Sequence, residues 1–164
     1  MAKYITRIGH LKQLPNQKVG DIVYPKTELG EMGMTGQTTV IHGHIDTIRV
    51  DDFLYINRFP DQIWRSYDYE NGRVTAAPEQ TDYLIGEITD TGLFGCKRKI
   101  LHPYHDSGYT IAMNGKRHWG TDVDSTDPNR RIFMWNRSFK ATLLDAKLDP
   151  LGGYGFYICV GYER

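Results

Sequence analysis

Cysteine is scarce in this 164-residue sequence, which contains only Cys96 and Cys159. The two residues lie far apart and neither belongs to a C-x-x-C pair, so a cysteine-rich zinc site is excluded. We therefore expect two reduced thiols, which fits synthesis in a reducing cytoplasm.

The chain also lacks an excess of charge of either sign, because 20 Lys and Arg residues balance 20 Asp and Glu residues. This balance excludes a globally basic nucleic-acid-binding protein, and we expect no nucleic-acid partner. Segment 1–13 has no apolar run of the kind that a secretory leader needs. The apolar segment 152–162 is too short to span a bilayer as a helix, so we expect no membrane partner.

Helical periodicity is scarce as well, and most of the sequence alternates with the two-residue period of a strand. The 11 Tyr, 6 Phe and 3 Trp residues favour strands over helices. Asn-Gly pairs at 71–72 and 114–115 stand where hairpin turns need positive φ angles. The strands that we expect lie at 4–8, 19–24, within 38–59, 63–69, 73–76, 83–88, 99–101, 109–113, 116–119, 131–135 and 156–162.

One segment, 138–148, has apolar residues near helical spacing, with a serine at its start and a proline beyond its end. It predicts one short helix. The glycine-rich segment 27–37 and the polar segment 121–130 are predicted as loops. Together the patterns predict a single all-β domain over 1–164, a sandwich or barrel of about nine or ten short antiparallel strands with at most one short helix.

Charge is segregated along the chain although it balances overall. Segment 41–92 has 4 basic and 10 acidic residues, a net charge of −6, and segment 93–140 has 9 basic and 4 acidic residues, a net charge of +5. Copies with these zones on different faces would attract head to tail, whereas interleaved zones would pair within one molecule. The apolar C-terminal strand also needs a covering strand, from the same chain or another. The candidate interface residues are Asp51, Asp52, Asp61, Lys97, Arg98, Lys99, Phe156, Tyr157, Ile158 and Tyr162.

Histidines and aspartates offer candidate metal ligands. Two histidines in an H-x-H pattern share one face of an expected strand, as paired ligands do, and two more follow near residue 102. Three aspartates within 121–130 alternate like the start of a calcium loop, but the Gly and Glu that an EF-hand requires are absent. Ordinary surface and packing roles are the alternative for all of them. The candidates are His42, His44, His102, His105, Asp122, Asp124 and Asp127.

Motifs of the common catalytic families are missing, since the chain has no G-x-S-x-G elbow, no Walker loop and no G-x-G-x-x-G. We therefore expect no enzyme and no cofactor. Trp64, Trp119 and Trp135 could form a platform for a sugar, which leaves a glycan-binding module open.

Three short segments resemble small β-rich phage virion proteins. They are Lys18–Val23, Gly72–Ala77 and Tyr83–Ile88, which contain runs of the type G-D-x-V and I-G-x-I. The resemblance implies a structural component of a phage particle, a capsid-decorating or tail-associated protein that contacts copies of itself and other virion proteins. It also implies a location in the virion after synthesis in the host cytoplasm. The alternatives are a sugar- or ligand-binding receptor module and a small metal-dependent enzyme.

Overall fold

A computed structural model describes residues 3–24, 27–54, 75–76, 98–102, 111, 113, 120–125, 128–133, 141–149 and 153–163. The elements named among these residues are all β-strands. They are β1 (Lys3–Leu11), β2 (Ile22–Val23), β3 (Glu28–Glu31), β4 (Gly43–Val50), β5 (Thr75–Ala76), β6 (Arg98–His102), β7 (Thr121–Ser125), β8 (Arg131–Phe133), β9 (Ala141–Leu148) and β10 (Phe156–Glu163). None of the described residues belongs to a helix that is long and apolar enough to cross a membrane.

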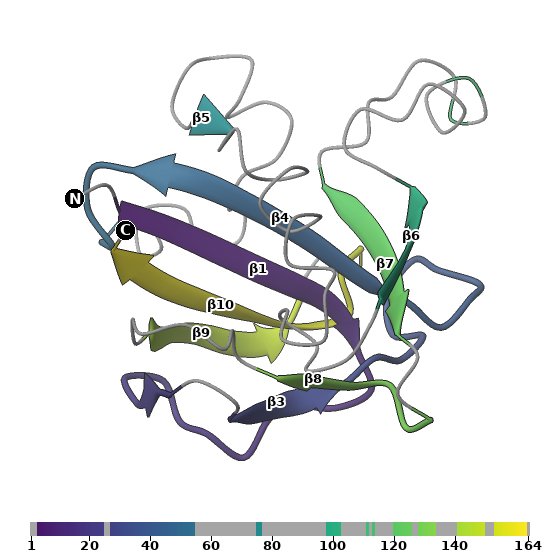
Figure 1. Cartoon of the computed structure of the whole chain (residues 1–164), viewed down its shortest axis with the longest axis horizontal. Helices are drawn as coiled ribbons and strands as arrows, with labels where there is room; N and C mark the ends of the chain where they lie inside the picture. The colour runs from purple at the N-terminus through teal and green to yellow at the C-terminus, as the bar shows by residue number, and fades with distance from the viewer. Residues whose placement is uncertain are drawn as a thin grey trace.

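Two antiparallel sheets make up the described fold (Figure 1). The larger sheet has eight strands, in the order β2-β9-β10-β1-β4-β7-β6, with β5 paired to β4 beside this path. Strands β3 and β8 form the second, two-stranded sheet. Because β2 and β6 stand at opposite ends of the order and no pairing among the described residues joins them, the larger sheet is open. The all-β prediction is confirmed, and the barrel alternative is wrong.

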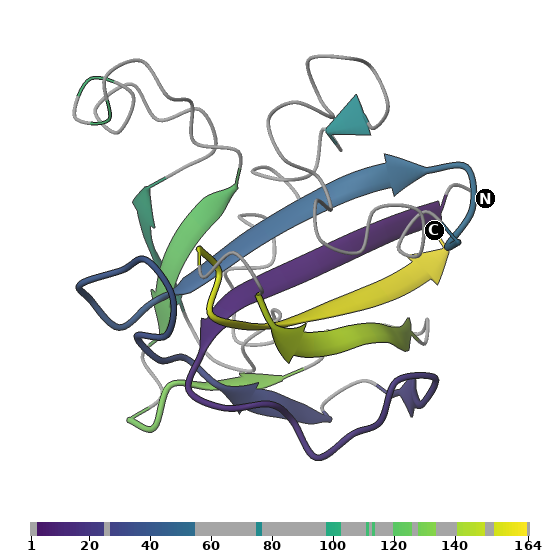
Figure 2. The same ribbon diagram turned by 180° about the vertical axis from the view of Figure 1, so that it is seen from behind.

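The main core lies between the two sheets. Alternation along the strands turns Ile8, Ile45 and Ile158 toward Leu29 of β3 and Ile132 of β8, and all five side chains are fully buried. Figures 1 and 2 show β3 and β8 beneath the larger sheet from both sides. A smaller apolar cluster occupies the opposite face of the larger sheet and consists of Ile5, Ile48, Tyr157 and Cys159.

The two ends of the chain meet in the middle of the larger sheet. Lys3 pairs with Glu163, and the first and last strands run antiparallel from there. Strand β10 is therefore flanked by β1 on one side and by β9 on the other. The strands that cover the apolar C-terminal segment come from the same chain.

The predicted helix at 138–148 is wrong, because residues Ala141–Leu148 form strand β9 between β10 and β2. A bulge explains the misleading pattern. Along β9 the pairing steps from Asp145 to Leu143 while β10 advances by a single residue, so Leu144 is the extra residue. The adjacent leucines pack into the two opposite clusters, and this doublet imitates helical spacing.

Two predicted loops are also partly wrong. Segment 27–37 contains β3, and segment 121–130 contains β7, whose polar residues pair with both β4 and β6. Nearly all the residues of the strands predicted at 63–69, 83–88, 109–113 and 116–119, and both Asn-Gly turns, lie outside the described residues.

Candidate functional site

A bulge at the end of β1 turns His10 out of the strand pattern. The pairing of β1 with β10 shifts between Ile8 and Leu11, and His10 has a φ of 61°, which non-glycine residues rarely adopt. Its backbone is held by two hydrogen bonds of 2.7 Å, from its own N–H to the carbonyl of Tyr154 and from the N–H of Gly33 to its carbonyl. Strain of this kind is retained where the surrounding structure fixes it, and it is often found at functional sites.

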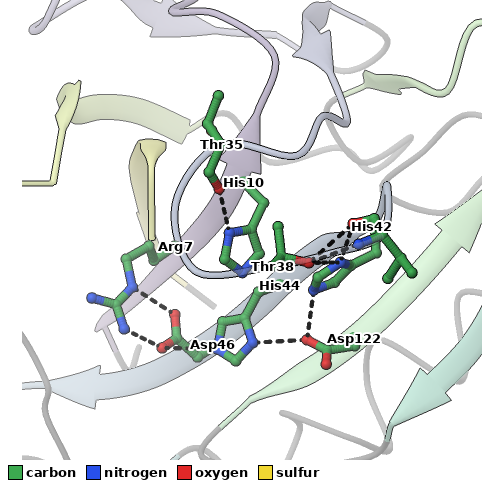
Figure 3. A network of polar contacts seen from close by, with 9 residues as sticks. Arg7, His10, Thr35, Thr38, His42, His44, Asp46 and Asp122 are labelled. Carbon is green, nitrogen blue, oxygen red and sulfur yellow. Dashed lines mark hydrogen bonds and ion pairs between the residues drawn. The ribbon is translucent and has the colours of Figure 1, made fainter. Parts of the chain in front are cut away.

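Strand pairing brings two histidines to one aspartate. His44 of β4 lies opposite Asp122 of β7, and its Nδ1–H donates to Asp122 Oδ1 at 2.9 Å. His42 approaches the same oxygen, with its Nε2 at 3.5 Å. The Nδ1–H of His42 donates to the carbonyl of Val40 at 3.0 Å. One carboxylate oxygen therefore serves both rings (Figure 3).

The ring of His10 completes the cluster. Its centroid lies 4.7 Å from that of His42 and 6.2 Å from that of His44. The Nδ1–H of His10 donates to the carbonyl of Thr35 at 2.8 Å, which leaves the lone pair on Nε2 when the ring is neutral. His10 comes from β1, His44 comes from β4 and His42 directly precedes β4, and the three rings gather beside β7 (Figure 3).

Glycines make room for this arrangement. A Cβ atom at position 120 would lie 2.5 Å from His44 Nε2, and a Cβ at position 9 would lie 2.9 Å from the ring of Tyr154. Gly36, with a φ of 84°, presses against the backbone of residues 153–155. This contact seats the segment that carries Thr35 against the turn that carries Tyr154.

A buried ion pair lies under the cluster. Arg7 donates from Nε to Asp46 Oδ1 at 3.1 Å and from Nη2 to Oδ2 at 2.5 Å, and the Asp46 side chain is fully buried. The guanidinium lies 3.6 Å from the centroid of the Tyr154 ring. Burial by itself lowers the pKa of Arg7, but the adjacent carboxylate outweighs burial and raises the pKa above its ordinary value.

The environment shifts the pKa values of two histidines in opposite directions. Burial lowers the pKa of His10 to about 4, and the neighbouring His44 and His42 add to this effect. Burial acts in the same direction on His42, but the ion pair with Asp122 and the bond to the Val40 carbonyl outweigh it and raise the pKa of His42 above 6.5. At neutral pH His10 is therefore neutral, and His42 takes up a proton more readily than an exposed histidine.

These side chains line a cavity of about 780 Å³. One wall is the polar segment 36–39, and apolar parts are contributed by Val40, Leu101, Met113 and Tyr154. All three clustered histidines and Asp122 contribute to its lining. The volume falls in the range of ordinary small-molecule sites.

The predicted metal ligands divide into two groups. His42, His44 and Asp122 are brought together, whereas Asp124 binds Arg130 at 2.9 Å instead. The backbone of His102 pairs with Asp122, but His105 and Asp127 lie outside the described residues. In the described part of the chain, no three side chains of His, Cys, Asp and Glu are arranged to hold a metal ion. The metal hypothesis gains no support there.

The described candidates for an interface lie in several different parts of the fold. Asp51 is exposed, and Asp52 caps a turn by accepting the N–H of Leu54 at 2.7 Å. Arg98 and Lys99 belong to β6, while the predictions at Asp61 and Lys97, and the three tryptophans, lie outside the described residues. The remaining candidates, Phe156, Tyr157, Ile158 and Tyr162, belong to β10, where the last three are buried in the core of the same chain and Phe156 is partly buried.

The sequence did not predict His10, Arg7 or Asp46 as site residues. His10 sits at the end of an alternating run, and only the bulge turns it to the cavity. A faint signal existed for the ion pair, since Arg7 and Asp46 are charged residues inside two of the clearest strand patterns. A charged side chain that is buried within a strand requires a partner that compensates its charge.

Comparison with protein-family models, with curated proteins and with solved structures found no match for this chain. Functional inference therefore rests on the geometry of the site.

Proposed function

We propose that the protein is an acid–base catalyst that binds a small substrate in the cavity beside β4 and β7. The observation that carries the proposal is the pair His10 and His42, which line one cavity and whose pKa values are shifted in opposite directions. Two neighbouring titratable groups whose pKa values differ in this way can divide the roles of acid and base between them.

His10 has the properties of the base. Its Nδ1–H is bound to the Thr35 carbonyl, so a proton can be accepted only at Nε2. Because its pKa is about 4, the ring is deprotonated throughout the neutral range. The strained backbone and its two hydrogen bonds hold the ring in place, which reduces the reorganisation that proton transfer needs.

His42 has the properties of the acid. Its Nδ1–H is bound to the Val40 carbonyl, so the second proton of the imidazolium lies on Nε2. That atom is 3.5 Å from Asp122 Oδ1, which is close enough for the carboxylate to stabilise the charge but longer than a normal hydrogen bond. The proton on Nε2 can therefore be given to a substrate.

The reaction class that uses such a pair is group transfer or hydrolysis. A hydroxyl or water nucleophile would lose its proton to His10 Nε2 as it attacks, and the leaving group would take the proton from His42 Nε2 as its bond breaks. The polar segment 36–39 offers hydroxyl and amide groups for orientation, and the apolar wall suits a substrate with an apolar part.

The test combines titration with turnover. We expect ring NMR signals to show His10 titrating near pH 4 and His42 titrating above pH 6.5. A screen of chromogenic esters and phosphodiesters should find turnover that falls by about a hundredfold or more in His10→Gln and in His42→Gln. Asp145→Asn is the control, because Asp145 binds Tyr157 and Lys147 away from the cavity. Two histidines that both titrate near 6.5, or turnover that survives both substitutions, would refute the proposal.

A structural role in a particle is the second candidate, and one observation favours it. Strand β2 is an end strand of the open sheet. Its residue Ile22 is 43% exposed, and the nearby Val19 and Tyr24 are 58% and 59% exposed. An exposed apolar edge can accept a strand from another copy. Light scattering at low and high salt should then show an oligomer that Ile22→Lys dissociates and that Leu148→Lys, an exposed control on β9, leaves intact. A monomer at all salt concentrations would count against self-assembly.

A further inference from the structure

His44 lies between two carboxylates. Its Nδ1 is 2.9 Å from Asp122 Oδ1 on β7, and its Nε2 is 3.9 Å from Asp46 Oδ2 on its own strand. Gly120 leaves the space that the Nε2 edge of the ring occupies, since a Cβ there would lie 2.5 Å from that atom. An anionic group therefore lies on the side of each ring nitrogen.

The side chain of Asp46 is held in a fixed position by its neighbours. Both of its oxygens accept hydrogen bonds from Arg7, and the guanidinium is covered by the Tyr154 ring. The carboxylate is fully buried and is not among the side chains that line the cavity. Its connections to the cavity run through His44 and through Arg7, which packs on Tyr154.

Asp122 connects His44 with the proposed acid. The same atom, Oδ1, accepts the Nδ1–H of His44 and lies 3.5 Å from Nε2 of His42. A proton can thus pass from one ring to the other through a single carboxylate oxygen once a small rotation of the His42 ring shortens the longer contact.

We propose that His44 is a proton relay that reloads His42 through Asp122, and that Asp46 is the positioning residue that makes the relay work. The proposal rests on the proposed function, in which His42 becomes neutral when it gives its proton to the leaving group. The imidazolium of His44 then passes its Nδ1 proton to Asp122 Oδ1, and Asp122 passes a proton to His42 Nε2. His44 ends neutral, His42 ends as the imidazolium, and Asp122 is unchanged.

Asp46 determines which proton His44 keeps. After the transfer the neutral ring holds its remaining proton on Nε2, the atom that faces Asp46. A carboxylate there favours this tautomer, and Arg7 keeps the carboxylate in place. The other groups that face the ring are His10, with centroids 6.2 Å apart, and Tyr154, with centroids 5.4 Å apart.

The experiment follows the imidazole nitrogens of His44 by ¹⁵N NMR in the whole protein. In the wild type we expect a proton on Nε2, the atom that faces Asp46. In Asp46→Asn, which keeps the shape of the side chain and removes its charge, we expect Nε2 to lose its proton while Nδ1 stays bound to Asp122. Asp145→Asn, a carboxylate on the same face of the sheet without contact to His44, should match the wild type.

A second variant covers the case in which Asp46→Asn does not fold. Gly120→Ala keeps both residues of the Arg7–Asp46 pair, and its Cβ would press on the Nε2 edge of His44 at 2.5 Å and on the carbonyl of Ile45 at 2.8 Å. It should produce the same loss of the Nε2 proton. Wild-type ¹⁵N signals in Gly120→Ala, or in a folded Asp46→Asn, would overturn the proposal.

Measurements of turnover distinguish a relay from a purely structural role of these residues. With a substrate found in the screen, both variants should lower kcat by about tenfold or more and leave KM unchanged, because reloading follows substrate binding. A rise in KM with an unchanged kcat would overturn the relay. Failure of the proposed function is recognised separately, since it shows in the titrations of His10 and His42 and not in the tautomer of His44.

Discussion

Acid should destabilise the fold through His10 in particular. The pKa of this histidine falls from 6.5 in the unfolded chain to about 4 in the folded protein, chiefly because its ring is buried and only 6% of the residue is exposed. Because the pKa is lower in the folded protein, the unfolded chain binds the proton more tightly. The contribution of His10 to stability is therefore fully present above pH 6.5 and declines as the pH falls toward 4. The shift corresponds to about 3 kcal/mol of unfolding free energy.

Urea unfolding at pH 7 and at pH 4 measures this effect, and His10→Asn isolates it. Asparagine tolerates a positive φ and can donate to the Thr35 carbonyl, but it does not titrate. The difference in unfolding free energy between the two pH values should therefore be smaller in the variant by about 3 kcal/mol. His42→Asn is the matched control, because its raised pKa contributes stability below 6.5 that is lost as the pH rises, the opposite sign. Equal pH dependence in the wild type and His10→Asn would refute the burial of a neutral ring.

Three further predictions concern the surroundings of the site. Arg7→Met leaves the buried Asp46 without its cation and should cost about 3–5 kcal/mol in urea unfolding, and a loss below 1 kcal/mol would contradict the described ion pair. Gly36→Ala should lower the unfolding free energy more than Gly20→Ala in the same assay. Both glycines have a positive φ, but only position 36 presses on neighbouring backbone. The reverse order would be inconsistent with the packing against 153–155. In a Cys96→Ala variant, Cys159 should react with a thiol reagent only as the protein unfolds, because the thiol is buried and burial raises its pKa. Rapid labelling of the folded protein would contradict this burial.

The local pattern of the sequence was sufficient for the fold class. Alternation at 4–8 and the apolar run at 156–162 predicted the two strands that lie side by side in the middle of the larger sheet, and the H-x-H pattern named two of the histidines that lie at Asp122. The prediction failed where a bulge interrupts alternation, as at Leu144, and where polar residues pair on both sides, as in β7.

The composition of the cluster was decided by the tertiary structure. His10 reaches the cavity because pairing of β1 with β10 slips at that point, and Asp122 reaches His44 because β7 pairs with β4 in one particular register. Both events depend on strands that are distant in the chain. A two-residue period reports only which face a side chain takes within its own strand, whereas register and bulges are set by the partner strand and by the packing of the whole sheet. The sequence by itself therefore determined an all-β protein with candidate histidines, and the pairing of distant strands determined that His10, His42, His44 and Asp122 form one site.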